Sequence, residues 1–169
     1  MEKKGFTFWS IFVAIILIDL LTKNLAESYL KDKTIEVIPN FFNLTLVWNK
    51  GAAFGILAES PEYVRKLFLI GSSLIAAVVV IVYFLKSKDK LSNFETLSLA
   101  LIGGGAVGNL YDRLFLGQVR DFLDFYIKDH HWPAFNVADA SISVGIAFFI
   151  FYELYYKKRS IIKNQSKLS

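Results

Sequence analysis

Long apolar runs are the feature that most limits what this chain can fold into. The four runs extend over residues 5–18, 67–85, 96–111 and 132–152. Only the last of them contains a charged residue, Asp139. A helix that crosses the hydrocarbon core of a membrane needs about 20 mostly apolar residues. We therefore predict a single integral membrane domain over residues 1–169, with transmembrane helices at about 6–23, 67–86, 95–113 and 134–154.

The composition agrees with a membrane protein and excludes several other classes. Hydrophobic residues make up 54% of the chain and charged residues only 20%, against about 25% in an ordinary soluble domain. The absence of cysteine excludes disulfides, thiolate catalysis and thiolate metal sites. The only histidines, His130 and His131, are adjacent, so we expect no metal and no other cofactor. The net charge of +4 comes from short basic clusters rather than a stripe with interleaved aromatic residues, which argues against nucleic-acid binding.

The basic clusters predict how the chain is oriented. Ten of the 19 basic residues lie in residues 1–5, 86–95 and 155–169. Because Lys and Arg stay on the cytoplasmic side, both termini are expected in the cytoplasm. The outside loops are then residues 24–66 and 114–133. The first run has the basic start of a cleaved signal peptide, but no A-x-A-like cleavage site follows it, so we predict an uncleaved helix.

The outside loops carry patterns of their own. Residues 34–38 and 43–48 alternate polar and apolar positions, and Pro39-Asn40 between them is a turn signal. They predict a small β-sheet in the first outside loop. In the second loop, Asp121, Asp124 and Lys128 recur at helical spacing among apolar residues, which predicts a short interfacial helix or an extended outer end of the third span. The predicted fold is thus an all-α membrane protein with four transmembrane helices, a small extracytoplasmic sheet and an interfacial helix before the last span.

Polar residues gather at one depth of this predicted arrangement. They lie at the outer ends of three spans, whose inner halves carry almost no polar residue. Ionisable groups in membrane spans are costly and are functional candidates by default. The group consists of Asp19, Lys23, Asn109, Asp112, Arg113, Asn136 and Asp139, with Asp121 just beyond the third span.

The spacing within this group predicts which side chains share a helix face. Asp19 and Lys23 are four residues apart and could pair, and Asn109 and Arg113 have the same spacing. Asn136 and Asp139 are three apart and also face one way. Gly103, Gly104, Gly105 and Gly108 precede the third-span cluster, and we interpret them as sites of close helix packing.

Two carboxylates are the natural reactive pair in such a cluster. The chain contains no P-loop, no H-E-x-x-H and no G-x-S-x-G motif. Two carboxylates a few Å apart cannot both ionise easily, so one keeps a proton while the other acts as a base. The alternative is that these aspartates cap helices or pair with Lys23, Arg113 and Arg120. The residues alone leave both interpretations open for Asp19, Asp112, Asp121, Asp124 and Asp139.

Four short motifs together resemble the lipoprotein signal peptidase (signal peptidase II) family. They are N-K-G-A-A-F at residues 49–54, G-N-L-Y-D-R at 108–113, V-R-D-F at 119–122 and F-N-V-A-D at 135–139. The resemblance covers nearly the whole chain. It implies an aspartic endopeptidase of the bacterial inner membrane that removes signal peptides from diacylglyceryl-modified prolipoproteins. Such an enzyme cleaves before the lipidated cysteine at the outer face of the membrane, and globomycin-type cyclic peptides inhibit it.

The resemblance also implies roles for individual residues. Asp121 and Asp139 correspond to the catalytic pair, and Asn109, Arg113 and Asn136 would line that pair and the substrate groove. Asn49 and Gly51 lie in the outer loop that approaches the substrate. Asp19 and Lys23 match a D-x-x-x-K element near the site with a structural role. This chain has Leu20 where the family often has Gln. A basic group at a membrane interface could equally hold a lipid phosphate, so that role stays open for Arg113.

Two non-enzyme functions are alternatives. A small proton- or cation-coupled transporter subunit also carries intramembrane aspartates, but it needs polar groups near the midplane. The inner halves of these predicted helices are apolar. A purely structural membrane subunit would not need so many polar residues facing one side. We expect prolipoproteins and membrane lipids as partners, and a monomer.

Overall fold

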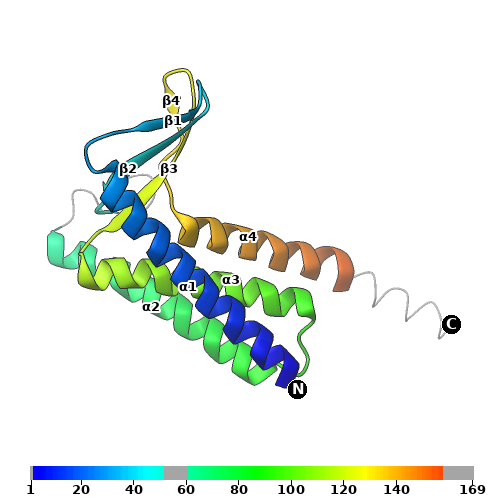
Figure 1. Cartoon of the computed structure of the whole chain (residues 1–169). Helices are drawn as coiled ribbons and strands as arrows, with labels where there is room; N and C mark the ends of the chain where they lie inside the picture. Colours follow the sequence, from blue (N-terminus) through cyan, green and yellow to red (C-terminus); the bar gives the residue numbers. More distant parts are fainter. Residues whose placement is uncertain (1, 52–60, 158–169) are drawn as a thin grey trace.

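The computed structural model describes residues 2–51 and 61–157. The described residues form a bundle of helices with a small sheet at one end (Figure 1). The helices are α1 (Glu2–Leu30), α2 (Glu62–Ser87), α3 (Asn93–Phe115) and α4 (Val137–Phe151), which a π-helical turn continues over Tyr152–Lys157. The strands are β1 (Ile35–Ile38), β2 (Phe42–Asn49), β3 (Val119–Ile127) and β4 (His130–His131).

Helix α3 lies at the centre of the bundle and packs against α1, α2 and α4. Its glycines allow this close packing. A Cβ atom on Gly104 would lie 2.8 Å from the Phe12 carbonyl oxygen of α1, and one on Gly105 would lie 2.5 Å from the Ala138 carbonyl oxygen of α4. Small residues let helix backbones approach closely in lipid. The interpretation of these glycines as packing sites is confirmed.

Three of the described helices are long and apolar enough to cross a membrane, namely Lys3–Leu30, Glu62–Ser87 and Val137–Tyr156. Helix α3, the third predicted span, is not among them. The boundaries also differ from the predicted ones at α1, which continues to Leu30 instead of ending near residue 23. The extra turns persist because Ala26 and Leu30 are buried against Phe122 of the sheet.

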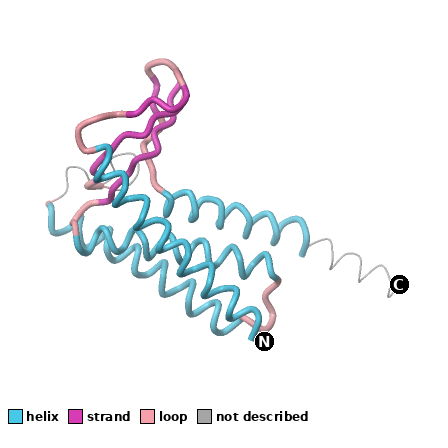
Figure 2. The backbone as a smooth tube through the Cα atoms, in the orientation of Figure 1, coloured by secondary structure: helices cyan, strands magenta, loops and turns pink. Residues whose placement is uncertain are grey.

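The N-terminal end of α1 and the α2–α3 connection meet at the end of the bundle remote from the sheet (Figures 1 and 2). Lys4 Nζ donates a hydrogen bond to the Leu91 carbonyl oxygen there. Phe8 of α1 stacks on Phe84 of α2, with ring centroids 3.8 Å apart. This apolar cluster holds the first two helices together, and the polar residues of interest lie at the opposite end.

The sheet is antiparallel, with strand order β1-β2-β3-β4. Strands β1 and β2 confirm the two strands predicted in the first outside loop. The predicted turn between them is also present, with Asn40 in the left-handed region at φ 60°. Asn tolerates this conformation better than most residues.

The predicted interfacial helix before the last span is wrong, because residues 119–127 form strand β3. Val119, Arg120, Asp121 and Phe122 are all buried in succession. A strand buried on both faces shows no alternation of polar and apolar residues. The charged residues Asp121, Asp124 and Lys128 happen to be spaced as on a helix, which led to the wrong prediction. Both connecting segments therefore contribute to one sheet, and the chain is not all-α. A register irregularity between Leu44 and Val47 of β2 places Val47 opposite Asp121.

Candidate active site

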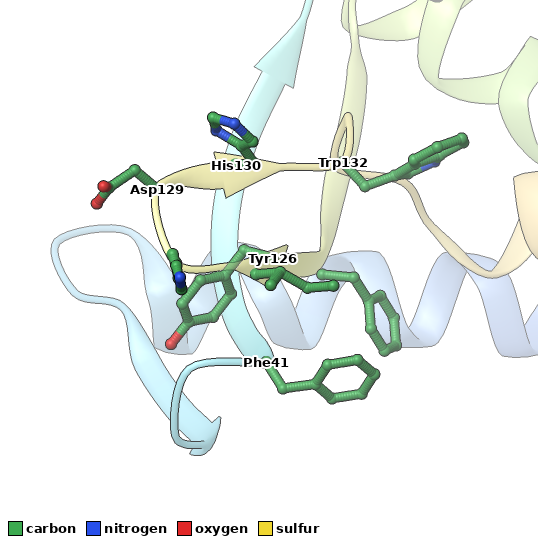
Figure 3. Close-up of a pocket in the computed structure, with 8 residues that line it drawn as sticks. Phe41, Tyr126, Asp129, His130 and Trp132 are labelled. Atoms are coloured by element: carbon green, nitrogen blue, oxygen red, sulfur yellow. The ribbon is translucent and has the colours of Figure 1, made fainter.

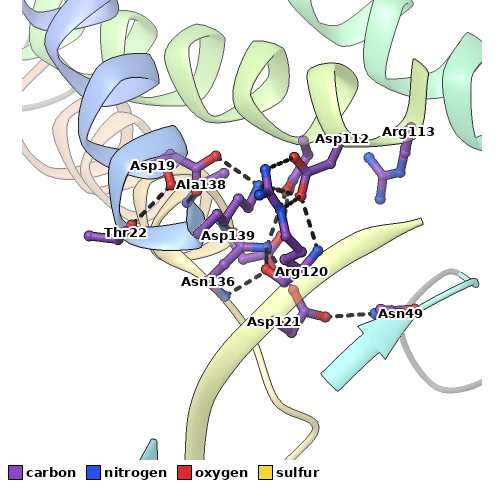
Figure 4. Close-up of polar contacts among 12 residues, drawn as sticks. Asp19, Thr22, Asn49, Asp112, Arg113, Arg120, Asp121, Asn136, Ala138 and Asp139 are labelled. Atoms are coloured by element: carbon purple, nitrogen blue, oxygen red, sulfur yellow. Dashed lines mark hydrogen bonds and ion pairs between the residues drawn. The ribbon is translucent and has the colours of Figure 1, made fainter. Parts of the chain in front are cut away.

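Two carboxylates from different elements line one cavity. Asp121 lies on β3 and Asp139 in the first turn of α4, and both border a cavity of about 480 Å³. Figure 4 shows the two side chains among the polar contacts where the sheet meets the helices. Asp121 is only 2% exposed. Among the described residues that line this cavity, these two are the only carboxylates.

Asn136 connects the two carboxylates. Its side-chain Nδ2 donates a hydrogen bond of 2.7 Å to Asp121 Oδ1. Its Oδ1 accepts from the backbone N–H of Asp139 at 2.9 Å, and its own backbone N–H donates to Asp139 Oδ2 at 3.3 Å. This reciprocal pair is a capping box at the start of α4. The predicted common face of Asn136 and Asp139 is confirmed, and the cap fixes the Asp139 side chain.

Asn109 of α3 supports Asp139 from the other side. Its Nδ2 donates to Asp139 Oδ1 at 2.7 Å. Its Oδ1 accepts from Lys23 Nζ at 3.0 Å and from Asn136 Nδ2 at 3.2 Å. Because an ammonium group can only donate, Lys23 fixes which end of the Asn109 amide faces Asp139.

Asn49, at the end of β2, completes the contacts of Asp121. Its Nδ2 donates to Asp121 Oδ2 at 2.9 Å, and its Oδ1 accepts from the backbone N–H of Gly51 at 3.0 Å. Both Asp121 oxygens thus accept from an asparagine amide. The rest of the motif that begins at Asn49, residues 52–54, lies outside the described residues.

The surroundings of Asp121 favour its protonated form. Burial and the nearby negative charge of Asp139 raise the pKa of Asp121 from 3.8 to about 7. The hydrogen bonds from Asn49 and Asn136 and the positive charge of Lys23 act in the opposite direction and do not cancel the effect. A carboxyl group with such a pKa can hold a proton near neutral pH, which is the requirement for one partner of an acid–base pair.

Asp19 and Lys23 form the pair that their spacing predicted. Lys23 Nζ lies 2.7 Å from Asp19 Oδ2 and 3.7 Å from Asp112 Oδ2, and all three side chains are fully buried. Asp19 Oδ1 also accepts from the backbone N–H of Ala138 at 2.8 Å, in the first turn of α4. This cluster connects α1, α3 and α4 directly behind the two carboxylates.

Asp112 does not pair with its neighbour Arg113. It accepts hydrogen bonds from Arg120 instead, at 3.1 Å from Nε and at 2.7 Å from Nη2. The Nη1 of Arg120 donates to Asn24 at 2.6 Å and to Glu27 at 2.9 Å. Pairing of an aspartate with Arg120 was one of the interpretations left open for these residues, and for Asp112 the structure shows it. The further contacts of Arg120 with Asn24 and Glu27 were not predicted.

Arg113 lines the cavity, and its hydrogen-bond partner is one that the sequence did not indicate. Its Nη1 donates to Ser73 Oγ on α2. The shared face with Asn109 does not become a contact between the two, since Asn109 bonds to Lys23, Asn136 and Asp139. Sequence reasoning also missed the wall that Trp132, Pro133 and Phe135 contribute.

The remaining candidate carboxylate, Asp124, lies away from the cavity. It accepts from His131 Nδ1, at 2.9 Å and 3.0 Å from its two oxygens, and from Asn43 Nδ2 at 3.2 Å. Asp19 and Asp112 are likewise held in structural contacts. The structure therefore separates the five candidate aspartates into three with structural partners and two, Asp121 and Asp139, on one cavity.

The fold and this site together define a helical membrane protein with two carboxylates on one cavity. Comparison with known proteins gives the family. Residues 11–155 match the family described as signal peptidase (SPase) II. The chain is 70% identical over 161 residues to a lipoprotein signal peptidase of Sulfurihydrogenibium sp. (strain YO3AOP1), covering 95% of this chain and 99% of that protein. It is 46% identical to a lipoprotein signal peptidase of Aquifex aeolicus (strain VF5), covering 97% and 94%.

Solved structures agree with the sequence comparison. Two structures of a bacterial membrane enzyme, at 2.3 Å and 1.9 Å resolution, superpose with TM-scores of 0.74 and 0.75, each at 32% identity. The first covers 88% of this chain and 87% of its own, and the second covers 89% and 94%. The chain belongs to the signal peptidase II family. These comparisons give no support to the transporter alternative.

Proposed function

We propose that this protein is an aspartic endopeptidase that removes signal peptides from diacylglyceryl-modified prolipoproteins, cleaving before the lipidated cysteine. The family and the names of the relatives support the substrate class. The observation that carries the catalytic type is the placement of Asp121 and Asp139 on one cavity, connected through Asn136.

In the proposed reaction, Asp121 holds the proton and Asp139 is the base. Asp139 takes a proton from water while the water oxygen attacks the carbonyl carbon of the scissile peptide bond. Asp121 donates its proton to the carbonyl oxygen, which gives a neutral tetrahedral intermediate. When the C–N bond breaks, the intermediate returns a proton to Asp121, and Asp139 delivers its proton to the leaving amine. Both carboxyl groups then have their starting protonation.

The asparagines serve this reaction by holding the two carboxylates in place. Asn136 and Asn49 bind opposite oxygens of Asp121, and Asn109 binds Asp139. Positioning of reacting groups by fixed hydrogen bonds lowers the entropy cost of reaching the transition state. Gly51 fixes Asn49 through its backbone N–H. Asp19 and Lys23 have a structural role behind the site.

We assign Arg113 to the substrate groove, where its cation faces the cavity. A lipid phosphate is the alternative ligand for the same group. An Arg113→Lys variant keeps the charge but loses the planar fork. Reduced turnover of Arg113→Lys would indicate that the planar guanidinium group makes directional hydrogen bonds to the substrate. Normal turnover would indicate that only the positive charge is needed.

We further propose four membrane spans, by adding α3 to the three helices that are long and apolar enough to cross a membrane. The 23 residues of α3 at 1.5 Å rise per residue are enough for a hydrocarbon core about 30 Å thick. The N-terminal end of α1 and the basic α2–α3 connection lie at the same end of the bundle, opposite the sheet. By the positive-inside rule that end is cytoplasmic. The site then faces the extracytoplasmic side of the bacterial inner membrane, where a monomer receives substrate by lateral diffusion in the lipid.

The substrate class is tested with the full-length protein in detergent. Two precursors are compared, one with a diacylglyceryl-modified cysteine and one with the same sequence unmodified. We expect cleavage of the modified precursor before the cysteine, and inhibition by a globomycin-type cyclic peptide. A folded protein that cuts neither precursor would contradict the proposal.

A further inference from the structure

A second hollow lies on the sheet, separate from the two carboxylates. It measures about 710 Å³, and its lining includes the aromatic rings of Phe41, Phe125, Tyr126 and Trp132. Figure 3 shows Phe41, Tyr126 and Trp132 around this pocket, with Asp129 and His130 from the β3–β4 hairpin beside them. We call this hollow the aromatic groove.

The walls of the aromatic groove are held by contacts within the sheet. Phe41 and Phe125 pack edge to face, with ring centroids 5.4 Å apart. Tyr126 stacks on His131 across β3 and β4, with centroids 4.9 Å apart and planes 8° from parallel. The groove is therefore formed before any ligand arrives, which lowers the cost of ordering it on binding.

The aromatic groove adjoins the cavity that Asp121 and Asp139 line, because the two hollows share one lining residue. Trp132 lines both hollows and is 64% exposed. The backbone N–H of Trp132 donates to the Phe125 carbonyl oxygen at 2.8 Å. This hydrogen bond fixes the backbone from which the Trp132 side chain reaches both hollows. Trp132 therefore marks the side of the cavity on which the groove lies.

The two hollows lie in different directions from the scissile bond. The catalytic cavity continues along α4, where Ile142 and Val144 line it. The aromatic groove lies on the sheet, which projects away from the helices (Figure 1). In a prolipoprotein the apolar signal peptide stays with the membrane and the helices. The chain after the cleaved bond has to leave on the opposite side, where the groove lies.

We propose that the aromatic groove binds the mature part of the substrate, as the short extended segment directly after the lipidated cysteine. This inference rests on the proposed function. Aromatic rings give apolar contact area to side chains of many kinds, which suits substrates whose mature sequences differ. Lys128 and Asp129 add one charge of each sign, so a segment with little net charge fits best.

The test compares two diacylglyceryl-modified precursors. One has about ten mature residues after the cysteine, which is about 33 Å of extended chain, and the other ends directly after the cysteine. The quantity measured is the ratio of kcat/KM for the long substrate to that for the short one. We expect a ratio of about ten for the wild type, the size of one good aromatic contact. The ratio should fall toward one in Phe41→Ala, which removes an aromatic ring of the groove. It should also fall in Ile127→Ala, which removes an aliphatic side chain that lines the groove as well. Ile127 is 68% exposed, so its replacement leaves the fold intact.

A control and three outcomes make the test decisive. Val37→Ala, on the exposed face of β1, removes a surface aliphatic side chain outside the groove and should keep the wild-type ratio. An unchanged ratio in Ile127→Ala and Phe41→Ala would overturn the proposal. If that unchanged ratio came with an equal loss of kcat/KM for both substrates, the groove would contact lipid instead. Failure of the wild type to cut either substrate would contradict the proposed function itself.

Discussion

The side-chain amide of Asn136 donates a hydrogen bond of 2.7 Å to Asp121 Oδ1. Asn136 is also the N-cap residue of α4, the helix that carries Asp139. One residue therefore contacts both Asp121 on β3 and Asp139 on α4. The sheet and the helix bundle are thus joined at the point where the proposed chemistry occurs. Any change that loosens this contact should affect activity more than stability.

The first prediction concerns this contact. Asn136→Ala removes the hydrogen bond to Asp121 and the cap of α4. Leaving a buried polar group without its hydrogen-bond partner costs about 1–3 kcal/mol, so kcat/KM should fall about 5- to 150-fold. Loss of the cap should lower stability by only about 1 kcal/mol. Precursor cleavage and thermal unfolding in detergent give the two numbers.

Asn43→Ala is the matched control. It removes an Asn–Asp hydrogen bond of 3.2 Å on the same sheet, to Asp124 outside the cavity. Its kcat/KM should stay close to that of the wild type. Equal losses in the two variants would mean that Asn136 acts only through the stability of the sheet.

A pH dependence follows from the surroundings of Asp121. Burial and the charge of Asp139 raise the pKa of Asp121 to about 7. As the pH rises through that value, Asp121 loses the proton that it would donate to the carbonyl oxygen, so kcat/KM should fall on the alkaline side. A rate that stays constant through neutral pH would contradict this assignment.

How much of this arrangement could be read from the sequence varies with the element. Strands β1 and β2 were predictable because polar and apolar residues alternate along residues 34–38 and 43–48 of the sequence. Strand β3 was not, because its first four residues are buried in succession and its aspartates repeat at helical spacing. The spacing of Asn136 and Asp139 predicted a shared face, and the structure adds the cap. The contacts of Arg120 depend on three elements meeting, and no spacing along the chain encodes them.

The buried cluster behind the site gives a stability prediction. Lys23→Met keeps the length of the side chain but removes the charge that faces Asp19 and Asp112. Breaking a buried ion pair by removing one partner costs about 3–5 kcal/mol, because it leaves uncompensated charge. We expect a clearly lower unfolding temperature in detergent, and no such change for Lys31→Met, whose side chain is exposed. Equal unfolding temperatures would mean that Lys23 is not needed to neutralise the cluster.

Helix packing next to Asp139 gives a further prediction. A methyl group on Gly105 would lie 2.5 Å from the Ala138 carbonyl oxygen, so Gly105→Ala must shift the start of α4. Overpacking of this kind costs about 1–3 kcal/mol, and the displaced carboxylate should lower turnover as well. Gly71→Ala meets nothing within 4 Å in the middle of α2, and should stabilise the helix by about 0.5–1 kcal/mol. Unfolding temperatures and cleavage rates that match in the two variants would contradict this account of α3–α4 packing.

The most direct test of the central claim is the cleavage rate of a diacylglyceryl-modified prolipoprotein by Asp121→Asn, Asp139→Asn and Asp124→Asn, each compared with the wild type. Loss of an acid or base catalyst costs about 10²- to 10⁴-fold in rate. The account predicts a loss of that size in the first two variants, both folded, and turnover near that of the wild type in Asp124→Asn, whose carboxylate lies on the same strand as Asp121 but outside the cavity. Near-normal turnover in either Asp121→Asn or Asp139→Asn would contradict it.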